Sequence, residues 1–247
     1  MWGNQTKGGL KIVLITKELL EEKNACISGI KWFRERFPNG IEYQALLDEL
    51  AKINRLSWVV WALDVFGKTD DILEVDDLIV DGDFFFTGSV VVKNSIKIAG
   101  NLCIGGFVEA GKDIDVKGNI KIGFDIKAGN NIEVGWESIV GGIIEAGGNV
   151  RADLNILTGT GIKAGGNIEV GGSIVTGSDD KNLSYIEAGQ NIKVNGVIAA
   201  CGNIKAAGDI KAGIDIESDE DIKAGCSIEA GFDIKAKANI KSGDNIR

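Results

Sequence analysis

The side chains available for chemistry in this chain are carboxylates and four thiols, because the sequence contains no histidine. The absence of histidine removes the commonest general base, the Ser-His-Asp and Cys-His arrangements, and every zinc site that uses histidine. The 35 glycines never form a P-loop. We therefore expect no catalytic residue and no cofactor, and we interpret the protein as a non-enzyme.

Aspartates at one recurring position raise the question of a calcium site. They include Asp209, Asp215, Asp221 and Asp233. Calcium-binding β-rolls have a nine-residue period, whereas the period here is six, and Asn, Asp and Ser interchange at this position. Hydrogen bonds between successive turns account for such side chains, so we expect no metal site.

The cysteines are far apart and show no CxxC pairing. They are Cys26, Cys103, Cys201 and Cys226. Reduced thiols in a cytoplasmic protein are the expected state. The apolar run from Ile12 to Ile15 is too short for a signal-peptide core or a membrane span.

A six-residue period governs the chain from Leu78 to Ile246. Every sixth residue is apolar except Ser138 and Asp180. Neither a helix nor an isolated strand sustains this period, whereas a three-sided β-solenoid of about 18 residues per turn does. We predict a mainly β fold with a helical module over residues 1–75 and a β-solenoid over residues 76–247. The handedness stays open, although the Lys or Glu that follows the large aliphatic residue favours the right-handed form.

Each position of the repeat has a physical role. In Asp209-Ile210-Lys211-Ala212-Gly213 the Ile and Ala point inward and the Lys points to solvent, because neighbouring strand residues face opposite sides. The Gly is expected to supply a positive φ at a corner. Asn or Asp before the Ile is expected to bond the backbone of an adjacent turn.

The first 75 residues predict a short strand and four helices. The strand is expected at Leu10–Ile15, and the helices at Lys17–Lys23 (capped by Thr16), Ile27–Arg36, Glu42–Ile53 and Trp58–Phe66 (capped by Ser57 and closed by Gly67). The third helix places four side chains on one face, namely Tyr43, Leu46, Leu47 and Leu50. This module can cap the amino-terminal end of the solenoid.

The net charge is −9, and most of it belongs to the solenoid. An acidic surface repels phosphate backbones, so we expect no direct binding of nucleic acid. Glu133, Glu169 and Glu187 are expected on one face, where they could contact a basic protein surface.

An exposed apolar patch is expected near the middle of the rod. Its candidate residues are Trp136, Ile139, Leu154, Leu157 and Val175. Such a patch marks an interface. The alternative is that Ser138 marks a local shift that turns Ile139 inward, with the loop from Ser178 to Tyr185 covering the rest.

The last turn gives a second candidate interface. Ile234, Ile240 and Ile246 continue the repeat to the end of the sequence without a cap. An open tip exposes apolar core and unpaired strand edge, so we expect a homodimer through this end.

The repeat and the segments before it resemble a family of proteins. The Ile-Lys-Ala-Gly and Ile-Glu-Ala-Gly hexads, preceded by the segments from Asn24 to Phe33 and from Phe37 to Gly40, are similar to solenoid proteins of phages and mobile elements that carry a short helical module. The segment from Gly202 to Ala206 also resembles bactofilin repeats. The phage-type resemblance implies an accessory protein in the cytoplasm of a bacterial host.

Two functions follow as hypotheses. The first is a non-enzymatic protein that binds a host protein and inhibits a defence complex, such as a CRISPR or restriction complex, through an acidic or apolar solenoid face. The second is a structural protein that polymerises as bactofilins do or forms a virion fibre segment.

Overall fold

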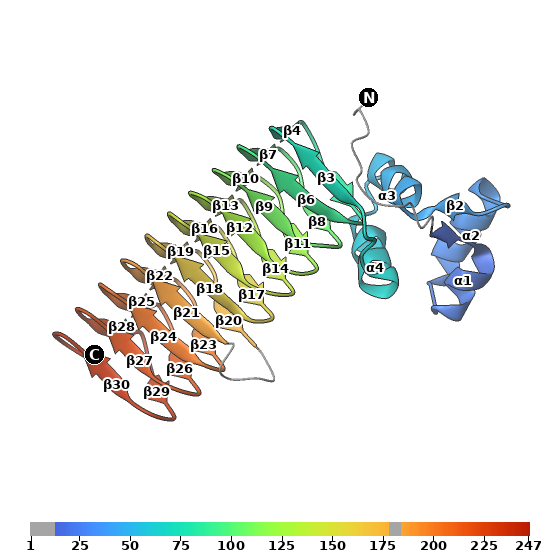
Figure 1. Ribbon diagram of the computed structural model, residues 1–247. Coiled ribbons are helices and arrows are strands. Elements are labelled where there is room, and N and C mark those ends of the chain that lie inside the picture. Colours follow the sequence, from blue (N-terminus) through green and yellow to red (C-terminus); the bar gives the residue numbers. More distant parts are fainter. Residues whose placement is uncertain (1–12, 178–183) are drawn as a thin grey trace.

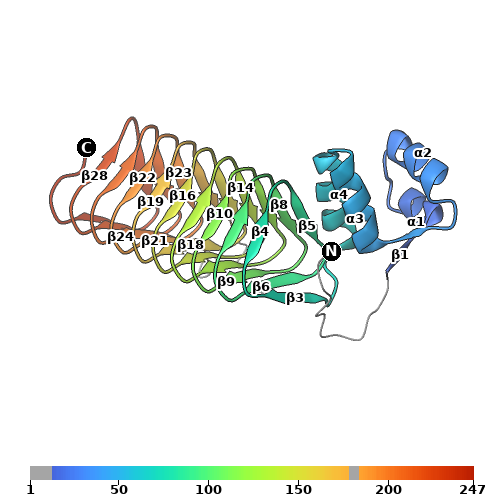
Figure 2. The same cartoon turned by 90° about the horizontal axis from the view of Figure 1, so that it is seen from above.

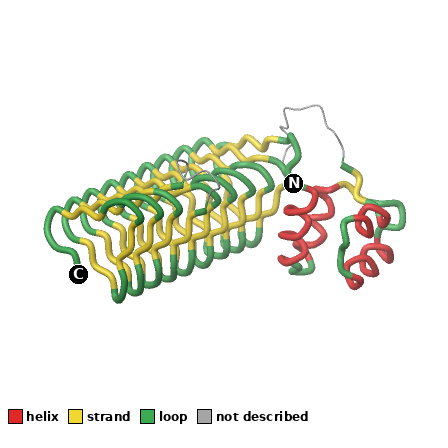
Figure 3. Tube along the Cα trace, turned by 90° about the horizontal axis from the view of Figure 1, so that it is seen from below, coloured by secondary structure: helices red, strands yellow, loops and turns green. Residues whose placement is uncertain are grey.

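The computed structural model describes residues 13–177 and 184–247. They form a rod of stacked strands with a helical module beside its amino-terminal end (Figure 1). Figure 3 shows the strands lying in rows that run the length of the rod, joined by short corners. The predicted β-solenoid with an amino-terminal helical module is confirmed.

Three parallel sheets form the sides of the rod, and each is named here by its first strand. The β3 sheet holds β3 (Ile72–Val75), β6 (Ser89–Val92), β9 (Val108–Ala110), β12 (Ile126–Ala128), β15 (Ile144–Ala146), β18 (Gly161–Ala164), β21 (Tyr185–Ala188), β24 (Asn203–Ala206), β27 (Ile222–Ala224) and β30 (Ile240–Ser242). The β4 sheet holds β4 (Leu78–Val80), β7 (Ile96–Ile98), β10 (Ile114–Val116), β13 (Ile132–Val134), β16 (Val150–Ala152), β19 (Ile168–Val170), β22 (Ile192–Val194), β25 (Ile210–Ala212) and β28 (Ile228–Ala230). The β5 sheet holds β5 (Phe84–Phe86), β8 (Leu102–Ile104), β11 (Ile120–Ile122), β14 (Ser138–Val140), β17 (Ile156–Thr158), β20 (Ile174–Thr176), β23 (Ile198–Ala200), β26 (Ile216–Ser218) and β29 (Ile234–Ala236).

The core lies between the three sheets and consists of the inward residues of every strand. In β10 the two flanking residues, Ile114 and Val116, are fully buried, while the central Asp115 faces outward. Ile114 pairs with Ile132 on the next turn and with Ile96 on the previous one. Each buried aliphatic side chain contributes about 1.5–3 kcal/mol relative to an exposed one. The repetition of this contact turn after turn stabilises the rod.

The corner glycines serve a different purpose from the one expected. Among the described glycines, positive φ occurs only at Gly40, Gly67 and Gly82, and none of these is a repeat corner of the kind expected. A Cβ at Gly165 would instead lie 2.1 Å from the carbonyl oxygen of Gly147 on the preceding turn. The expectation of a positive φ was wrong, because the close stacking of corner backbones excludes a side chain there.

Asparagine and aspartate side chains join successive turns, as predicted. The Asn101 Oδ1 accepts hydrogen bonds from the backbone N–H and the Nδ2 of Asn119, both at 2.9 Å. The Asn101 Nδ2 in turn donates to the Asp83 carboxylate. The same contact recurs along another corner, from Asp113 through Asn131 to Asn149.

One turn of the solenoid is longer than the others. Ile162 pairs with Ile186, so this turn spans 24 residues instead of the 18 that separate Ile144 from Ile162. The additional six residues keep the inward and outward alternation in phase, which explains why the period continues without a slip. Asp180 and most of the expected covering loop lie outside the described residues.

The solenoid begins at Ile72, four residues before the expected boundary at residue 76. Strand β3 pairs with β6 and aligns Leu73 with Val90. These two residues are separated by 17 positions, so β3 stands one residue out of the six-residue period.

The helical module contains two helical hairpins joined by a short antiparallel pair of strands, β1 (Leu14–Ile15) and β2 (Ile41–Glu42). Its helices are α1 (Lys17–Glu22), α2 (Ile27–Arg36), α3 (Tyr43–Lys52) and α4 (Leu56–Phe66). Thr16 caps α1 by accepting a hydrogen bond from the Leu19 N–H, and Gly67 ends α4 with a φ of 70°. The expected cap at Ser57 was wrong, because α4 begins at Leu56 and has Arg55 at its N-cap.

Candidate protein-binding face

The outer surfaces of the β3 and β4 sheets are covered by charges of both signs. From β9 onward, every central, outward residue of these two sheets is charged. Lys205 donates to Glu187 at 2.9 Å, and Lys211 lies 3.3 Å from Glu229. Pairs of this kind bring opposite charges together on both sheets, whereas Lys205, Lys223 and Lys241 follow one another on the last three strands of the β3 sheet.

The expected acidic face does not exist. Glu133 and Glu169 do lie on the β4 sheet, but Arg151 stands between them. Glu187 lies on the β3 sheet, between Lys163 and Lys205. The longer turn moved Glu187 to this sheet, because a constant spacing of 18 residues no longer holds beyond it.

The outer surface of the β5 sheet is apolar over its first six strands, except at Lys121. Its central residues are, in order, Phe85, Cys103, Lys121, Ile139, Leu157, Val175, Ala199, Glu217 and Lys235. From β9 onward, this sheet alone carries large aliphatic side chains where the others carry Lys, Arg, Asp and Glu. The outward Ile79 and Val91 of the other two sheets lie nearer the amino-terminal end. The difference identifies it as the candidate site.

Five large apolar side chains near the middle of this sheet are exposed to solvent, and we call them the apolar ladder. They are Trp136 (58% exposed), Ile139 (37%), Leu154 (43%), Leu157 (38%) and Val175 (44%). Ile139 pairs with Leu157, and Leu157 with Val175, on consecutive turns. The backbone N–H of Leu154 donates to the carbonyl of Trp136 at the adjoining corner. The structure thus brings all five predicted residues together.

Ser138 leaves the register of the strand unchanged. Its side chain is buried at the inward position between Ile120 and Ile156, and Ile139 remains outward. The alternative in which a local shift turns Ile139 into the core is therefore wrong.

The helical module covers the beginning of the same surface (Figure 2). Phe85 and Cys103 belong to one buried cluster with Leu46, Leu47 and Leu63 of the module. The Gln44 side chain of α3 donates to the Phe85 carbonyl and accepts from the Thr87 N–H. Burial raises the pKa of the Cys103 thiol to about 12. The first outward residues of the sheet are thus already an interface with helices, and the apolar ladder follows beyond Lys121.

Comparison with known proteins identifies only the module. Residues 6–68 match the family model of the YdhT N-terminal domain. No curated protein and no solved structure matches the chain. The amino-terminal part is therefore similar to that domain, while the relations to phage-type proteins and to bactofilins stay predictions.

Sequence reasoning missed a continuation of the corner beside the ladder. Ile214 and Phe232 lie at the same corner as Trp136 and Leu154, and the Phe232 side chain is 79% exposed. Between the two pairs, this corner holds Gly172 and Gly196. A hollow of about 400 Å³ lies elsewhere on the β5 sheet, around Val175 and Ala199. Ile214 and Phe232 are both apolar at a corner position in the sequence, but their assignment to this corner required knowledge of the 24-residue turn.

The predicted dimer tip lies at the far end of the rod. Ile234 and Ile240 are half-buried, and Ile246 is exposed and forms a parallel bridge with Ile228. The homodimer through this end stays a prediction.

The remaining chemical groups form no further centre in the described parts of the chain. Within residues 13–177 and 184–247, no group of three His, Cys, Asp or Glu side chains is placed to hold a metal ion. The four cysteines are free. No helix among the described residues is long and apolar enough to cross a membrane.

Proposed function

We propose that this protein binds another protein through the apolar ladder of the β5 sheet and has no catalytic activity of its own. The observation that carries the proposal is the cluster of five exposed apolar side chains on a rod whose other two faces carry paired charges. Contiguous exposed apolar surface marks interaction sites. Removal of that surface from water contributes about 25 cal/mol per Å².

The ladder has the composition of a binding centre. Trp136 provides a large rigid side chain of the type that dominates interface energies. Ile139, Leu157 and Val175 form a rigid platform, because each is fixed on a strand that is hydrogen-bonded on both sides. Little conformational entropy is lost when a partner covers such a surface.

The proposed occupant is an α-helix of the partner with an apolar stripe. The chain itself supports this choice, because helices α3 and α4 cover the continuation of the same surface at Phe85 and Cys103. A flat sheet face that accepts the module's helices at one end offers the same kind of contact further along. Each outward step along the sheet is about 4.8 Å, close to the 5.4 Å rise of one helical turn.

A host defence complex is the specific partner that the phage-type resemblance implies, and it remains part of the proposal. Binding to such a complex through apolar contact fits this surface better than binding that imitates the charge of a nucleic-acid backbone. The β3 and β4 sheets carry charges of both signs, as the Glu187–Lys205 pair illustrates, whereas a nucleic-acid backbone is uniformly negative.

The test is site-specific photo-crosslinking of the full chain in bacterial cells. A benzophenone amino acid replaces Leu157 on the ladder, and in a matched variant it replaces Lys163, which is outward and exposed on the same turn but on the β3 sheet. We expect position 157 to crosslink to a helix of one defined protein and position 163 to yield no such product.

The identified partner is then purified and its affinity measured. Leu157→Glu should weaken binding by at least about 30-fold, the effect of a central apolar contact, while Lys163→Glu should leave it unchanged. Equal crosslinking at the two positions would overturn the proposal. Crosslinking of position 157 to a second copy of the chain, with a monomeric Leu157→Glu variant, would replace the helical partner by self-association.

A further inference from the structure

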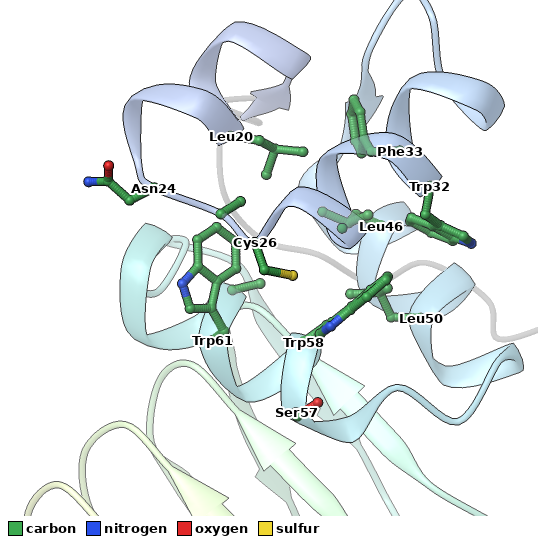
Figure 4. Close-up of a pocket in the computed structure, with 13 residues that line it drawn as sticks. Leu20, Asn24, Cys26, Trp32, Phe33, Leu46, Leu50, Ser57, Trp58 and Trp61 are labelled. Carbon is green, nitrogen blue, oxygen red and sulfur yellow. The ribbon is translucent and has the colours of Figure 1, made fainter.

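An aromatic cleft lies inside the helical module, apart from the apolar ladder. It occupies about 360 Å³ between the α1–α2 hairpin and the α3–α4 hairpin (Figure 4). Its walls consist of Leu20, Asn24, Ala25, Cys26, Gly29, Trp32, Phe33, Leu46, Leu50, Ser57, Trp58, Trp61 and Ala62. None of these residues belongs to the ladder, so the cleft is a separate feature.

The lining is apolar and carries no charged side chain. Three of the lining residues are tryptophans, and Figure 4 shows Trp58 and Trp61 on either side of the Cys26 thiol. The polar side chains of the lining residues are those of Cys26, Ser57 and Asn24, and Figure 4 shows the Asn24 amide directed away from the cleft. Ligand pockets of about 300–1,000 Å³ typically combine such an apolar wall with a few polar groups.

The tryptophans of the walls are held in place by aromatic and cationic neighbours. Trp32 packs edge-on against Trp58 at 5.7 Å and against Phe37 at 5.6 Å. Trp61 packs edge-on against Phe66 at 5.7 Å. The guanidinium groups of Arg36 and Arg55 lie over Trp32 and Trp58, respectively. The indoles are therefore fixed before any ligand arrives, which reduces the entropy lost on binding.

A glycine keeps the cleft open. A Cβ added at Gly29 of α2 would meet only the Cys26 Sγ, at 3.2 Å. Helix interiors disfavour glycine by about 1 kcal/mol relative to alanine. A larger residue at this position would improve the helix and occupy the space beside the thiol.

We propose that this cleft binds a small, uncharged, planar aromatic molecule. Its volume accommodates a compound of a few aromatic rings, its indoles offer edges and faces for stacking, and its lining contains no charge to compensate an ionic ligand. The Cys26 thiol and the Ser57 hydroxyl can form hydrogen bonds with a neutral donor or acceptor on the ligand.

The test is a titration of the full-length protein with N-phenyl-1-naphthylamine, a neutral dye that fluoresces in apolar surroundings. We expect saturable binding of one molecule per chain with quenching of tryptophan emission. Gly29→Leu should weaken binding by at least about 10-fold, since extra methylene groups would fill the cleft. Glu35→Leu, which adds the same side chain at an exposed position of α2, is the control and should bind as the wild type does.

Protection of Cys26 from alkylation tests whether the dye binds in the cleft. Saturating dye should slow the reaction of iodoacetamide at Cys26, while exposed Cys226 on the solenoid reacts at an unchanged rate. Absence of saturable binding, or equal binding by Gly29→Leu and wild type, would overturn the proposal. Tighter binding of the anionic dye 8-anilinonaphthalene-1-sulfonate than of the neutral dye would overturn the assignment to uncharged ligands.

Discussion

The Lys121 ammonium lies 3.0 Å from the Asp64 carboxylate, so an ion pair joins the third strand of the β5 sheet to helix α4. Lys121 interrupts the apolar series between Cys103, which the module covers, and Ile139, which is open. The pair therefore marks the edge of the module on the solenoid. The ion pair also contributes to the free energy with which the module docks on the solenoid.

Asp64→Asn should loosen the module and expose Cys103. The thiol is buried under the module and its pKa is about 12, so almost no thiolate is present at neutral pH and alkylation in the native protein should be very slow. Loss of a partly exposed ion pair costs about 0.2–1 kcal/mol, which should raise the population of the undocked module a few-fold. Mass spectrometry of each cysteine peptide over time measures this change.

The control is Glu35→Gln, which removes an exposed carboxylate of α2 away from the solenoid. It should leave the rate at Cys103 unchanged. If Cys103 reacts as fast as Cys226 in the wild type, the module is not docked in solution as described.

Two corner glycines should respond differently to alanine. In Gly165→Ala the new Cβ would lie 2.1 Å from the Gly147 carbonyl oxygen, and the overpacking should lower the free energy of unfolding by about 1–3 kcal/mol. In Gly177→Ala it would meet none of the described residues within 4 Å, and stability should change by less than about 0.5 kcal/mol. Urea unfolding followed by circular dichroism compares the variants, and equal losses at both positions would contradict the close stacking of corners.

Asp221 should stabilise the solenoid in a pH-dependent way. Hydrogen bonds from the Asn239 side chain and backbone N–H hold the pKa of its carboxyl below the ordinary value of 3.8. The contribution is therefore complete above pH 3.8 and is lost as the pH falls through the lower pKa of the folded state. A carbon-detected NMR titration should place the midpoint of Asp221 below 3.8.

Asn239→Ala is the matched change for that titration, because it removes the side-chain donor and leaves the carboxylate in place. The Asp221 midpoint should rise toward its ordinary value. An unchanged midpoint would show that the side-chain contact does not stabilise the ionised form.

Binding through the ladder should depend weakly on salt. The Debye length falls from about 10 Å at 0.1 M to about 3 Å at 1 M, so an interaction between charged surfaces would weaken steeply over that range. A contact made by Trp136, Ile139, Leu157 and Val175 lacks such charges and should keep its affinity. Titration calorimetry at several salt concentrations, with the partner that crosslinking identifies, measures this affinity. A steep loss would point to the charged β3 and β4 sheets instead.

The fold was predictable because one short-range pattern repeats. Ile114 and Asp115 already show which residue faces inward, and the same alternation recurs through the solenoid. The exposed ladder followed from the same alternation, since Leu157 occupies an outward position in a sequence where charge is the rule. No long-range information was needed for either conclusion.

The errors arose where the position of a residue depends on backbone stacking or on the length of a turn. Glu187 was assigned to the wrong sheet because the six-residue period conceals an inserted hexad. The role of Gly165 was misjudged because the approach of the Gly147 carbonyl is a contact between turns, which no local pattern reports. The aromatic cleft was missed for a related reason, since Trp61 and Cys26 come from different hairpins.

The stacking of turns also sets a scale of length. Lys121 and Ile139 stand one turn apart, so the ladder begins at a fixed distance beyond the edge of the module. Because every turn repeats the same contacts, removal or duplication of one 18-residue unit would slide the ladder by about 4.8 Å relative to the module without disturbing either. The number of turns thus sets the distance between the module and the ladder. A partner that contacted both surfaces would bind only when that distance matched its own two contact sites.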